Sequence, residues 1–139
     1  MLQETVQNVV DVINAGTYSD TFTAEVAWVP HTDNKDDDLK VFVWCDDANY
    51  NRETRCPDLK FSGTIKVAMR DRVNVDVQSD VTNKISLMQE IINQIGTVKT
   101  FAGGATFDSI SWFTVYDNQA LFEDSLFVSI FGMDIRSIV

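Results

Sequence analysis

The sequence predicts an α+β domain with two helices packed on one face of a roughly five-stranded, mixed and largely antiparallel sheet. Three observations predict this class. Apolar residues recur with helical spacing in two segments, five other segments have the pattern of strands, either alternating with period two or apolar on both faces, and the elements follow the order α-β-β-β-α-β-β. The chain has 139 residues, of which 45% are hydrophobic. This size and composition predict a single domain, residues 1–139, that can bury a core without a metal or a disulfide.

The two helices are predicted from apolar residues that fall on one helical face. In residues 2–15 these are Leu2, Val6, Val9, Val10 and Ile13, and in residues 81–95 they are Val81, Ile85, Met88, Ile92 and Ile95. Ser79 or Asp80 is the expected N-cap of the second helix, and Gly96 its expected end. We expect Ile85, Met88 and Ile92 to pack on sheet residues Phe61, Ile65 and Val67.

Five strands are predicted, over residues 21–29, 39–45, 58–70, 107–116 and 125–135. The strand at 58–70 alternates most regularly, with Phe61, Ile65 and Val67 on one face and Lys60, Lys66 and Arg70 on the other. Loops are expected at residues 31–38, 46–57 and 97–106.

The residues that could carry chemistry do not form a recognisable site. His31 has no nucleophile signature near it, and Cys45 and Cys56 lack the spacing of zinc ligands. A calcium loop that begins at Asp33 would need Gly and Glu at its sixth and twelfth positions, where the chain has Asp38 and Trp44. We therefore expect no enzymatic activity, no cofactor and no metal. Both cysteines are expected as thiols, with a single bridge between them as the alternative.

The aromatic residues of the second half of the chain are expected in the core or at a protein interface. They are Phe107, Trp112, Phe113, Tyr116, Phe122, Phe127 and Phe131. Base stacking requires a positively charged groove, and residues 73–139 hold only 3 basic residues against 8 acidic ones.

Charge is distributed unevenly along the chain. The net charge of −10 disfavours binding to phosphate backbones and to anionic membranes. Residues 1–50 carry net −8 and residues 73–139 net −5, whereas residues 51–72 carry net +3. Patches of opposite sign suit head-to-tail association of copies, although a solvated strand face would give the same pattern. The expected subunit-interface residues are Asp36, Asp37, Asp38, Arg52, Arg55, Arg70 and Arg72.

The N-terminal Met1–Glu4 lacks the basic start of a signal peptide, and no apolar run reaches the roughly 20 residues that span a bilayer. From the sequence we expect a soluble protein of a cytoplasm.

Short segments in a fixed order carry a resemblance to a known family. They are Asn14-Ala15-Gly16, Thr21–Glu25 leading to Trp28-Val29-Pro30, Leu39–Val43, Glu53-Thr54-Arg55, Asp71-Arg72-Val73, Leu87–Ile92 and Phe127–Gly132. In element order, spacing and size the chain resembles the small tail-terminator, or tail-completion, and neck proteins of long-tailed bacteriophages and related prophages. The resemblance covers nearly the whole chain.

The resemblance implies a structural role in the virion tail or neck, assembled in the bacterial host cytoplasm. Tail terminators cap the tail tube, usually as a hexameric ring, and join the tail to the head. The implied partners are further copies of the chain, the tail tube protein, the head-completion or connector protein and, in contractile tails, the sheath. DNA would pass through the lumen without specific binding.

Other functions remain open at this point. Within the same class, the chain could be the adjoining head-completion or neck adaptor protein. From other classes, it could be an acidic DNA mimic or inhibitor, or a small ligand-binding domain.

Overall fold

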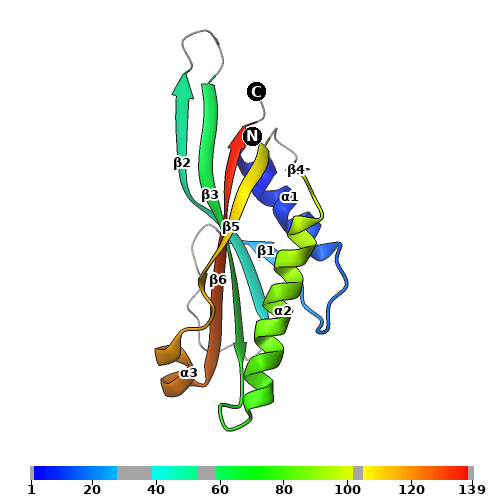
Figure 1. The fold of residues 1–139 in the computed structure, drawn as a ribbon, viewed down its shortest axis with the longest axis vertical. Helices are drawn as coiled ribbons and strands as arrows, with labels where there is room; N and C mark the ends of the chain where they lie inside the picture. Colours follow the sequence, from blue (N-terminus) through cyan, green and yellow to red (C-terminus); the bar gives the residue numbers. More distant parts are fainter. Residues whose placement is uncertain (1, 28–38, 53–58, 102–104, 138–139) are drawn as a thin grey trace.

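The computed structural model describes residues 2–27, 39–52, 59–101 and 105–137. These residues form one six-stranded sheet in the order β1-β2-β3-β6-β5-β4 (Figure 1). The elements are α1 (Leu2–Asn14), β1 (Ala24–Val26), β2 (Lys40–Arg52), β3 (Leu59–Arg72), α2 (Gln78–Gly96), β4 (Thr100–Phe101), β5 (Ala105–Thr114), α3 (Asn118–Asp124) and β6 (Leu126–Ser137).

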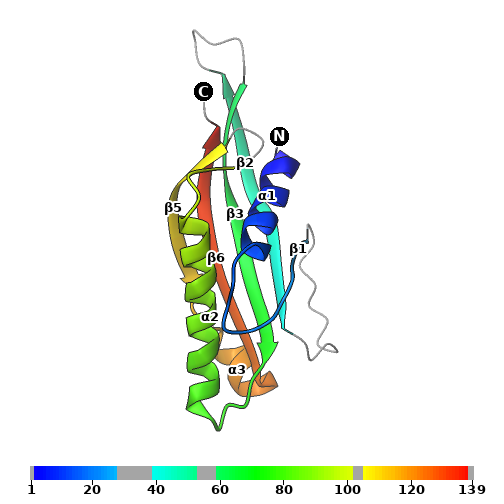
Figure 2. The ribbon, with the colours of Figure 1, turned by 90° about the vertical axis from the view of Figure 1, so that its right-hand side faces the viewer.

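The predicted α+β class is confirmed. Strands β1 and β2 pair in parallel, and all the other described pairs are antiparallel, so the sheet is mixed and largely antiparallel. Helices α1 and α2 lie on the same face of the sheet (Figure 2). The sheet has six strands instead of about five because a two-residue strand, β4, pairs with β5 inside the segment expected as a loop.

The core lies between the helices and the inward face of β2, β3 and β6. On β3, Ile65, Val67 and Met69 are fully buried, as are Phe127 and Phe131 on β6. The register places Val67 beside Phe131, so neighbouring inward side chains pack across the strands. The alternation predicted for β3 is therefore confirmed.

Strand β2 is longer than predicted. Residues 46–52, expected as a loop, continue the strand as the partner of the first half of β3. A register shift between Cys45 and Asp47 interrupts the alternation, so the apolar pattern that identified the strand stops there. A Cβ at Gly63, opposite this shift, would collide with the Asp47 backbone carbonyl. Of the predicted strand 21–29, residues 21–23 are not in a strand, β1 covers Ala24–Val26, and residues 28 and 29 lie outside the described residues.

The predicted N-cap of α2 is wrong. Helix α2 begins at Gln78 after Val77, whose side chain makes no capping hydrogen bond. The Asp80 carboxylate instead accepts a hydrogen bond of 2.7 Å from the backbone N–H of Asn74. Asp80 thus fixes the turn that leads into the helix.

The face that α2 buries is rotated from the predicted one. Its buried residues are Leu87, Met88, Ile91 and Ile95, whereas Ile85 and Ile92 are only partly buried at the margin of the core. Of the three residues predicted to pack on the sheet, Met88 alone is fully buried.

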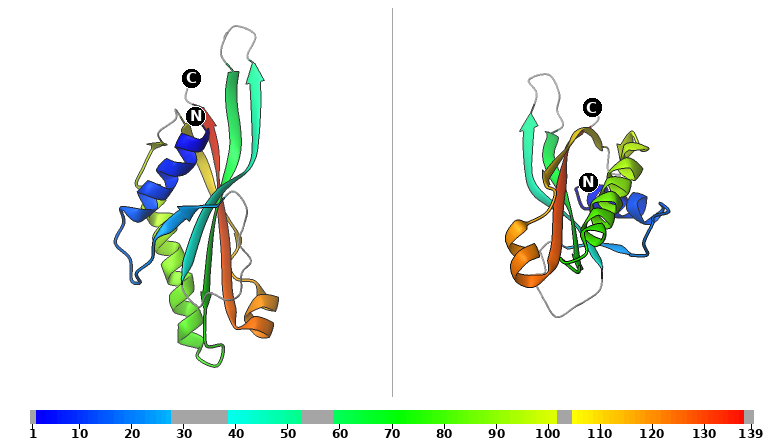
Figure 3. Two further views of the ribbon diagram at one scale, coloured as in Figure 1. Left: turned by 180° about the vertical axis from the view of Figure 1, so that it is seen from behind. Right: turned by 60° about the horizontal axis from the view of Figure 1, so that its bottom comes forward.

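Helix α3 was not predicted, since its seven residues lie between the predicted strands 107–116 and 125–135. It packs against the lower end of β6, on the side away from α2 (Figures 1 and 3). Leu121 is its buried residue.

The rotation of α2 gives a stability prediction for two adjacent residues. Ile91→Ala should lower the free energy of unfolding by about 2–5 kcal/mol, because Ile91 is fully buried. Ile92→Ala should cost clearly less. Urea denaturation of both variants measures this difference, and equal losses would contradict the observed rotation of α2.

Candidate interaction surfaces

The basic side chains of β3 lie on the sheet face opposite the helices, which we call the outer sheet face. Lys60, Lys66, Arg70 and Arg72 alternate with the inward residues of β3, and the register places Lys40 beside Arg70 and Arg136 beside Ser62 on the same face. Of the lysines and arginines whose side chains the structure describes, all except Lys84 and Lys99 are on this face.

The predicted interface residues are only partly within the described structure. Arg70 and Arg72 both lie on the outer sheet face near the end of β3. Arg52 is the last residue of β2, but its side chain is not among those described. Asp36, Asp37, Asp38 and Arg55 lie outside the described residues, as do His31 and Cys56.

Two of the basic side chains of the outer sheet face form ion pairs with neighbouring carboxylates. Lys66 forms an ion pair of 3.0 Å with Asp46, and its ammonium lies 5.2 Å from the centroid of the Phe113 ring. Arg136 forms a 2.7 Å ion pair with Asp108. A Cβ at position 132 would collide with the Phe113 ring, so glycine allows this ring to approach the backbone of β6 closely.

The helix layer carries charge of the opposite sign. Helices α1 and α2 and the loop at 15–23 hold five acidic residues, Glu4, Asp11, Asp20, Asp80 and Glu90, and one basic residue, Lys84. Lys84 is enclosed by two carboxylates, with its Nζ 2.6 Å from Asp71 on β3 and 3.0 Å from Asp20 in the loop. The side chains of Lys84 and Asp71 are only 13% and 12% exposed.

This arrangement shifts the pKa of Lys84 and of Asp20 in opposite directions. Burial disfavours the charged Lys84 ammonium, but its hydrogen bonds to Asp71 and Asp20 outweigh burial and raise the pKa of Lys84. The hydrogen bond from Lys84, supported by the backbone N–H of Thr21, lowers the pKa of the Asp20 carboxyl. Lys84 and Asp20 therefore remain charged over a wider pH range, and the two ion pairs tie α2 to β3 and to the loop.

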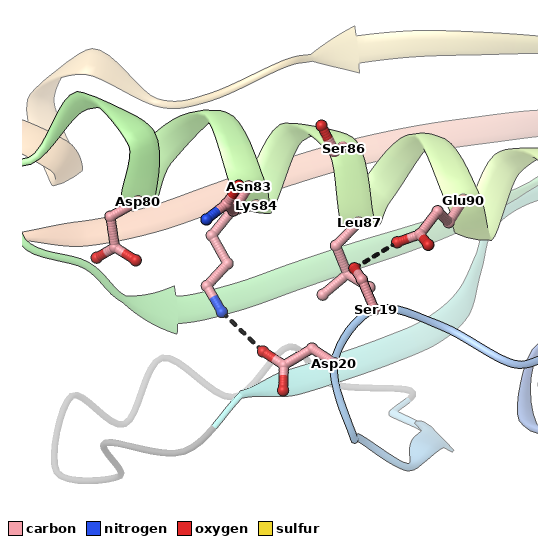
Figure 4. A pocket seen from close by; sticks show the side chains of 8 residues that line it. All are labelled: Ser19, Asp20, Asp80, Asn83, Lys84, Ser86, Leu87 and Glu90. Carbon is pink, nitrogen blue, oxygen red and sulfur yellow. Dashed lines mark hydrogen bonds and ion pairs between the residues drawn. The ribbon is translucent and has the colours of Figure 1, made fainter.

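A groove of about 620 Å³ runs between α2 and the loop at 15–23. It is lined by Ser19, Asp20, Asp80, Asn83, Lys84, Ser86, Leu87 and Glu90 (Figure 4). Its charged groups already have partners: Glu90 accepts a 2.7 Å hydrogen bond from Ser19, Asp80 holds the turn at Asn74, and Lys84 holds Asp20. These side chains therefore have structural roles in holding the loop and the turn to α2.

Tyr18 helps to close the same loop. Its hydroxyl donates a hydrogen bond of 2.6 Å to the backbone carbonyl of Ile13, and its ring packs on Phe22. Burial, with the nearby negative charge of Glu90, raises the pKa of Tyr18 to about 12. The phenol is consequently a neutral donor at physiological pH and holds the end of α1 in place.

Possible metal ligands are scattered over the described residues. Within them, no cluster of three or more His, Cys, Asp or Glu side chains could hold a metal ion. Cys45 is a free thiol, and its partial burial, with the charge of Asp47, raises its pKa and makes it a weaker nucleophile.

The aromatic residues divide between core and surface. Phe127 and Phe131 are fully buried, and the partly buried Trp112 donates a hydrogen bond of 2.8 Å to Ser129. Phe113, Tyr116 and Phe122 are exposed. The sequence predicted that these aromatic residues lie either in the core or at an interface. It did not show which residue has which position, because α3 was not predicted.

A scan against protein-family models finds no match for this chain, and a search of curated proteins also finds none. Among the helices that the structure describes, none combines the length and apolarity needed to cross a bilayer.

The Lys84–Asp71 pair gives a prediction for stability. Lys84→Met should lower the free energy of unfolding by about 3 kcal/mol, because it leaves the Asp71 carboxylate buried beside an apolar side chain. The double variant Lys84→Met/Asp71→Asn should recover most of this loss. Urea denaturation of the single and double variants tests the pair, and an equal loss in both would mean that the pair is not coupled.

The lowered pKa of Asp20 gives a prediction for pH dependence. A carboxylate with a lowered pKa stabilises the fold above its unfolded pKa of 3.8, and that contribution disappears as the pH falls through the lowered folded value. Asp20→Asn should therefore lower the melting temperature near neutral pH and have progressively less effect below about pH 4. In a Lys84→Met background the pH-dependent difference should be smaller, because the hydrogen bond from Lys84 has been removed and the one from the backbone N–H of Thr21 remains.

Proposed function

We propose that the chain is a structural virion protein that caps a phage tail tube as a ring and joins the tail to the head. The role is one of assembly, without catalysis or a cofactor. The resemblance in element order suggests this function. The structural observation that supports it is that charges of opposite sign lie on opposite layers of the domain. Lys40, Lys60, Lys66, Arg70 and Arg72 lie on the outer sheet face, and the acidic residues of α1 and α2 lie on the helix layer.

Two different surfaces on opposite sides of one chain favour head-to-tail contacts between copies. Contacts of this kind close into a ring when the rotation between copies allows it, whereas a self-complementary patch would give a two-fold dimer. Exposed ion pairs contribute only about 0–1 kcal/mol each, so charge would select the partner and its orientation while apolar contacts supply most of the affinity. The hexamer is the ring size that the resemblance implies.

In this proposal the partners are other copies of the chain, the tail tube protein and the head-completion or connector protein, with the sheath added in contractile tails. Assembly takes place in the bacterial host cytoplasm, and the mature protein is in the virion. DNA passes through the ring without specific binding, which is consistent with the net charge of −10.

The capping role is tested by measuring the length of the tails that assemble in the absence of the chain. When the coding sequence is interrupted in the phage or prophage that encodes it, electron microscopy of the lysate should show tubes of uncontrolled length and no joined heads. Complementation with the intact chain should restore tails of uniform length. Tails of normal length that only lack heads would instead identify the chain as the neck adaptor.

The charge contacts are tested in the same complementation. Arg70→Glu with Arg72→Glu should leave tubes uncapped, because the altered outer sheet face would repel the acidic surface of the next copy. Lys99→Glu is a control, since Lys99 is exposed but lies outside the outer sheet face. Asp→Lys changes at residues 36–38 should partly restore capping if these residues are the acidic partners. Uniform tails with the arginine double variant would contradict the charge-paired ring.

A further inference from the structure

The exposed apolar side chains of this chain are concentrated at one end of the molecule. Among the described residues, seven large apolar side chains are exposed, and five of them come from the β3–α2 turn, the β5–α3 connection and α3 itself. These five, which we call the α3 end, are Val75, Val77, Val115, Tyr116 and Phe122. Phe122 is the most exposed of all at 75%, whereas Tyr50 belongs to the hairpin of β2 and β3 at the opposite end (Figure 1).

The segments of the α3 end are held beside one another. The β3–α2 turn follows β3, and α3 precedes β6. These two strands are adjacent in the sheet, with Arg72 paired to Leu126. The backbone N–H of Val73 donates a 3.0 Å hydrogen bond to the carbonyl of Ser125, which joins the end of β3 to the end of α3. Figures 1 and 2, taken at right angles, both place the β3–α2 turn and α3 at the same end.

The α3 end is also well ordered by its own hydrogen bonds. Asp117 caps α3 by accepting from the backbone N–H of Ala120 at 3.1 Å, and Ser125 ends the helix in the left-handed conformation at a φ of 52°. In the turn, the N–H of Asn74 donates to Asp80 and the N–H of Val77 donates to the Asn74 carbonyl. Because the backbone is already fixed, binding through this surface would cost little ordering entropy.

The charges around the α3 end are almost all negative. Asp76, Asp117, Glu123 and Asp124 are exposed there, and Arg72 is the single basic residue in the segments 72–80 and 115–126. A second copy that docked through the same end would place these carboxylates against their equivalents, which is unfavourable. The matching surface is therefore apolar at its centre and has lysine or arginine at its rim.

We propose that the α3 end is the surface through which each subunit docks on the tail tube, against tube subunits that present an apolar patch with a basic rim. This inference rests on the proposed function. A cap must bind the tube end from solution, so its docking surface must be exposed and already formed in the free chain. In the described structure the α3 end meets both conditions.

Co-sedimentation with tail tubes tests the proposal. The tubes are assembled from the tube protein of the phage that encodes the chain. Phe122→Glu should bind the tubes about tenfold more weakly or worse, since it replaces the most exposed of these apolar side chains by a charge. Tyr50→Glu makes the same kind of change in an exposed aromatic residue at the other end and should bind like the original chain. Glu123→Lys with Asp124→Lys keeps the apolar centre but should also weaken binding, because the altered rim would repel the basic rim of the tube.

The outcomes separate this inference from the proposed function. Equal binding by the original chain and by Phe122→Glu would overturn the α3 end as the docking surface and leave the cap intact. A change in oligomeric state with Phe122→Glu, measured by sedimentation without tubes, would show that this end contacts other copies and would also overturn the inference. Absence of binding by any variant, together with tails of normal length in lysates lacking the chain, would overturn the proposed function itself. Melting curves establish that each variant is folded, as expected for exposed positions.

Discussion

The strict alternation of side chains along β3 is the constraint on which the rest of the structure depends. This strand pairs with β2 on one side and β6 on the other, and its inward residues form the floor on which both helices pack. A shift of one residue would turn Lys66 and Arg70 toward the helices and expose Ile65 and Val67. Because burial of an unpaired charge is far more costly than its exposure, only one register is stable. The same alternation that builds the core thereby separates basic residues from the acidic helix layer.

The inward series of β3 ends with a charge, Asp71, and this determines how α2 is oriented. Lys84 must face the sheet to pair with Asp71, so the residues one and two turns further along on that side of the helix become the buried ones. This explains why Leu87 and Ile91 are buried where the hydrophobic pattern alone favoured Ile85 and Ile92. Apolar packing stabilises the contact between α2 and β3, and the ion pair sets its orientation. Replacement of Lys84 alone would leave the Asp71 carboxylate buried without its partner.

Much of the fold could be predicted from the sequence because long elements carry strong patterns. The alternation over 58–70 and the helical periodicity over 2–15 led to the correct class and to the correct face of β3. The short elements could not be found in this way, since two residues in β4 or seven in α3 contain too little periodicity. The part of β2 after Cys45 was not predicted, because its residues are mostly polar and the bulge moves its alternate side chains to the opposite face of the sheet. Among the surface residues, the alternation placed Arg70 on the correct face of β3. The α3 end could not be predicted, because tertiary packing decides which aromatic residues are left uncovered.

The irregular pairing of β5 affects how the protein behaves among many copies of itself. Its register against β6 shifts twice, between Phe107 and Ser109 and again between Ser111 and Thr114. Strand β4 covers the other side of β5 only at its first two residues. A long, regular strand in such a position would be a template for continuous sheet growth from molecule to molecule, the route to amyloid-like fibres. The two bulges break the spacing of the N–H and C=O groups that an incoming strand would need. The two bulges therefore disfavour the growth of fibres when copies are crowded. Contacts between copies then depend on their side-chain surfaces and not on open strand edges.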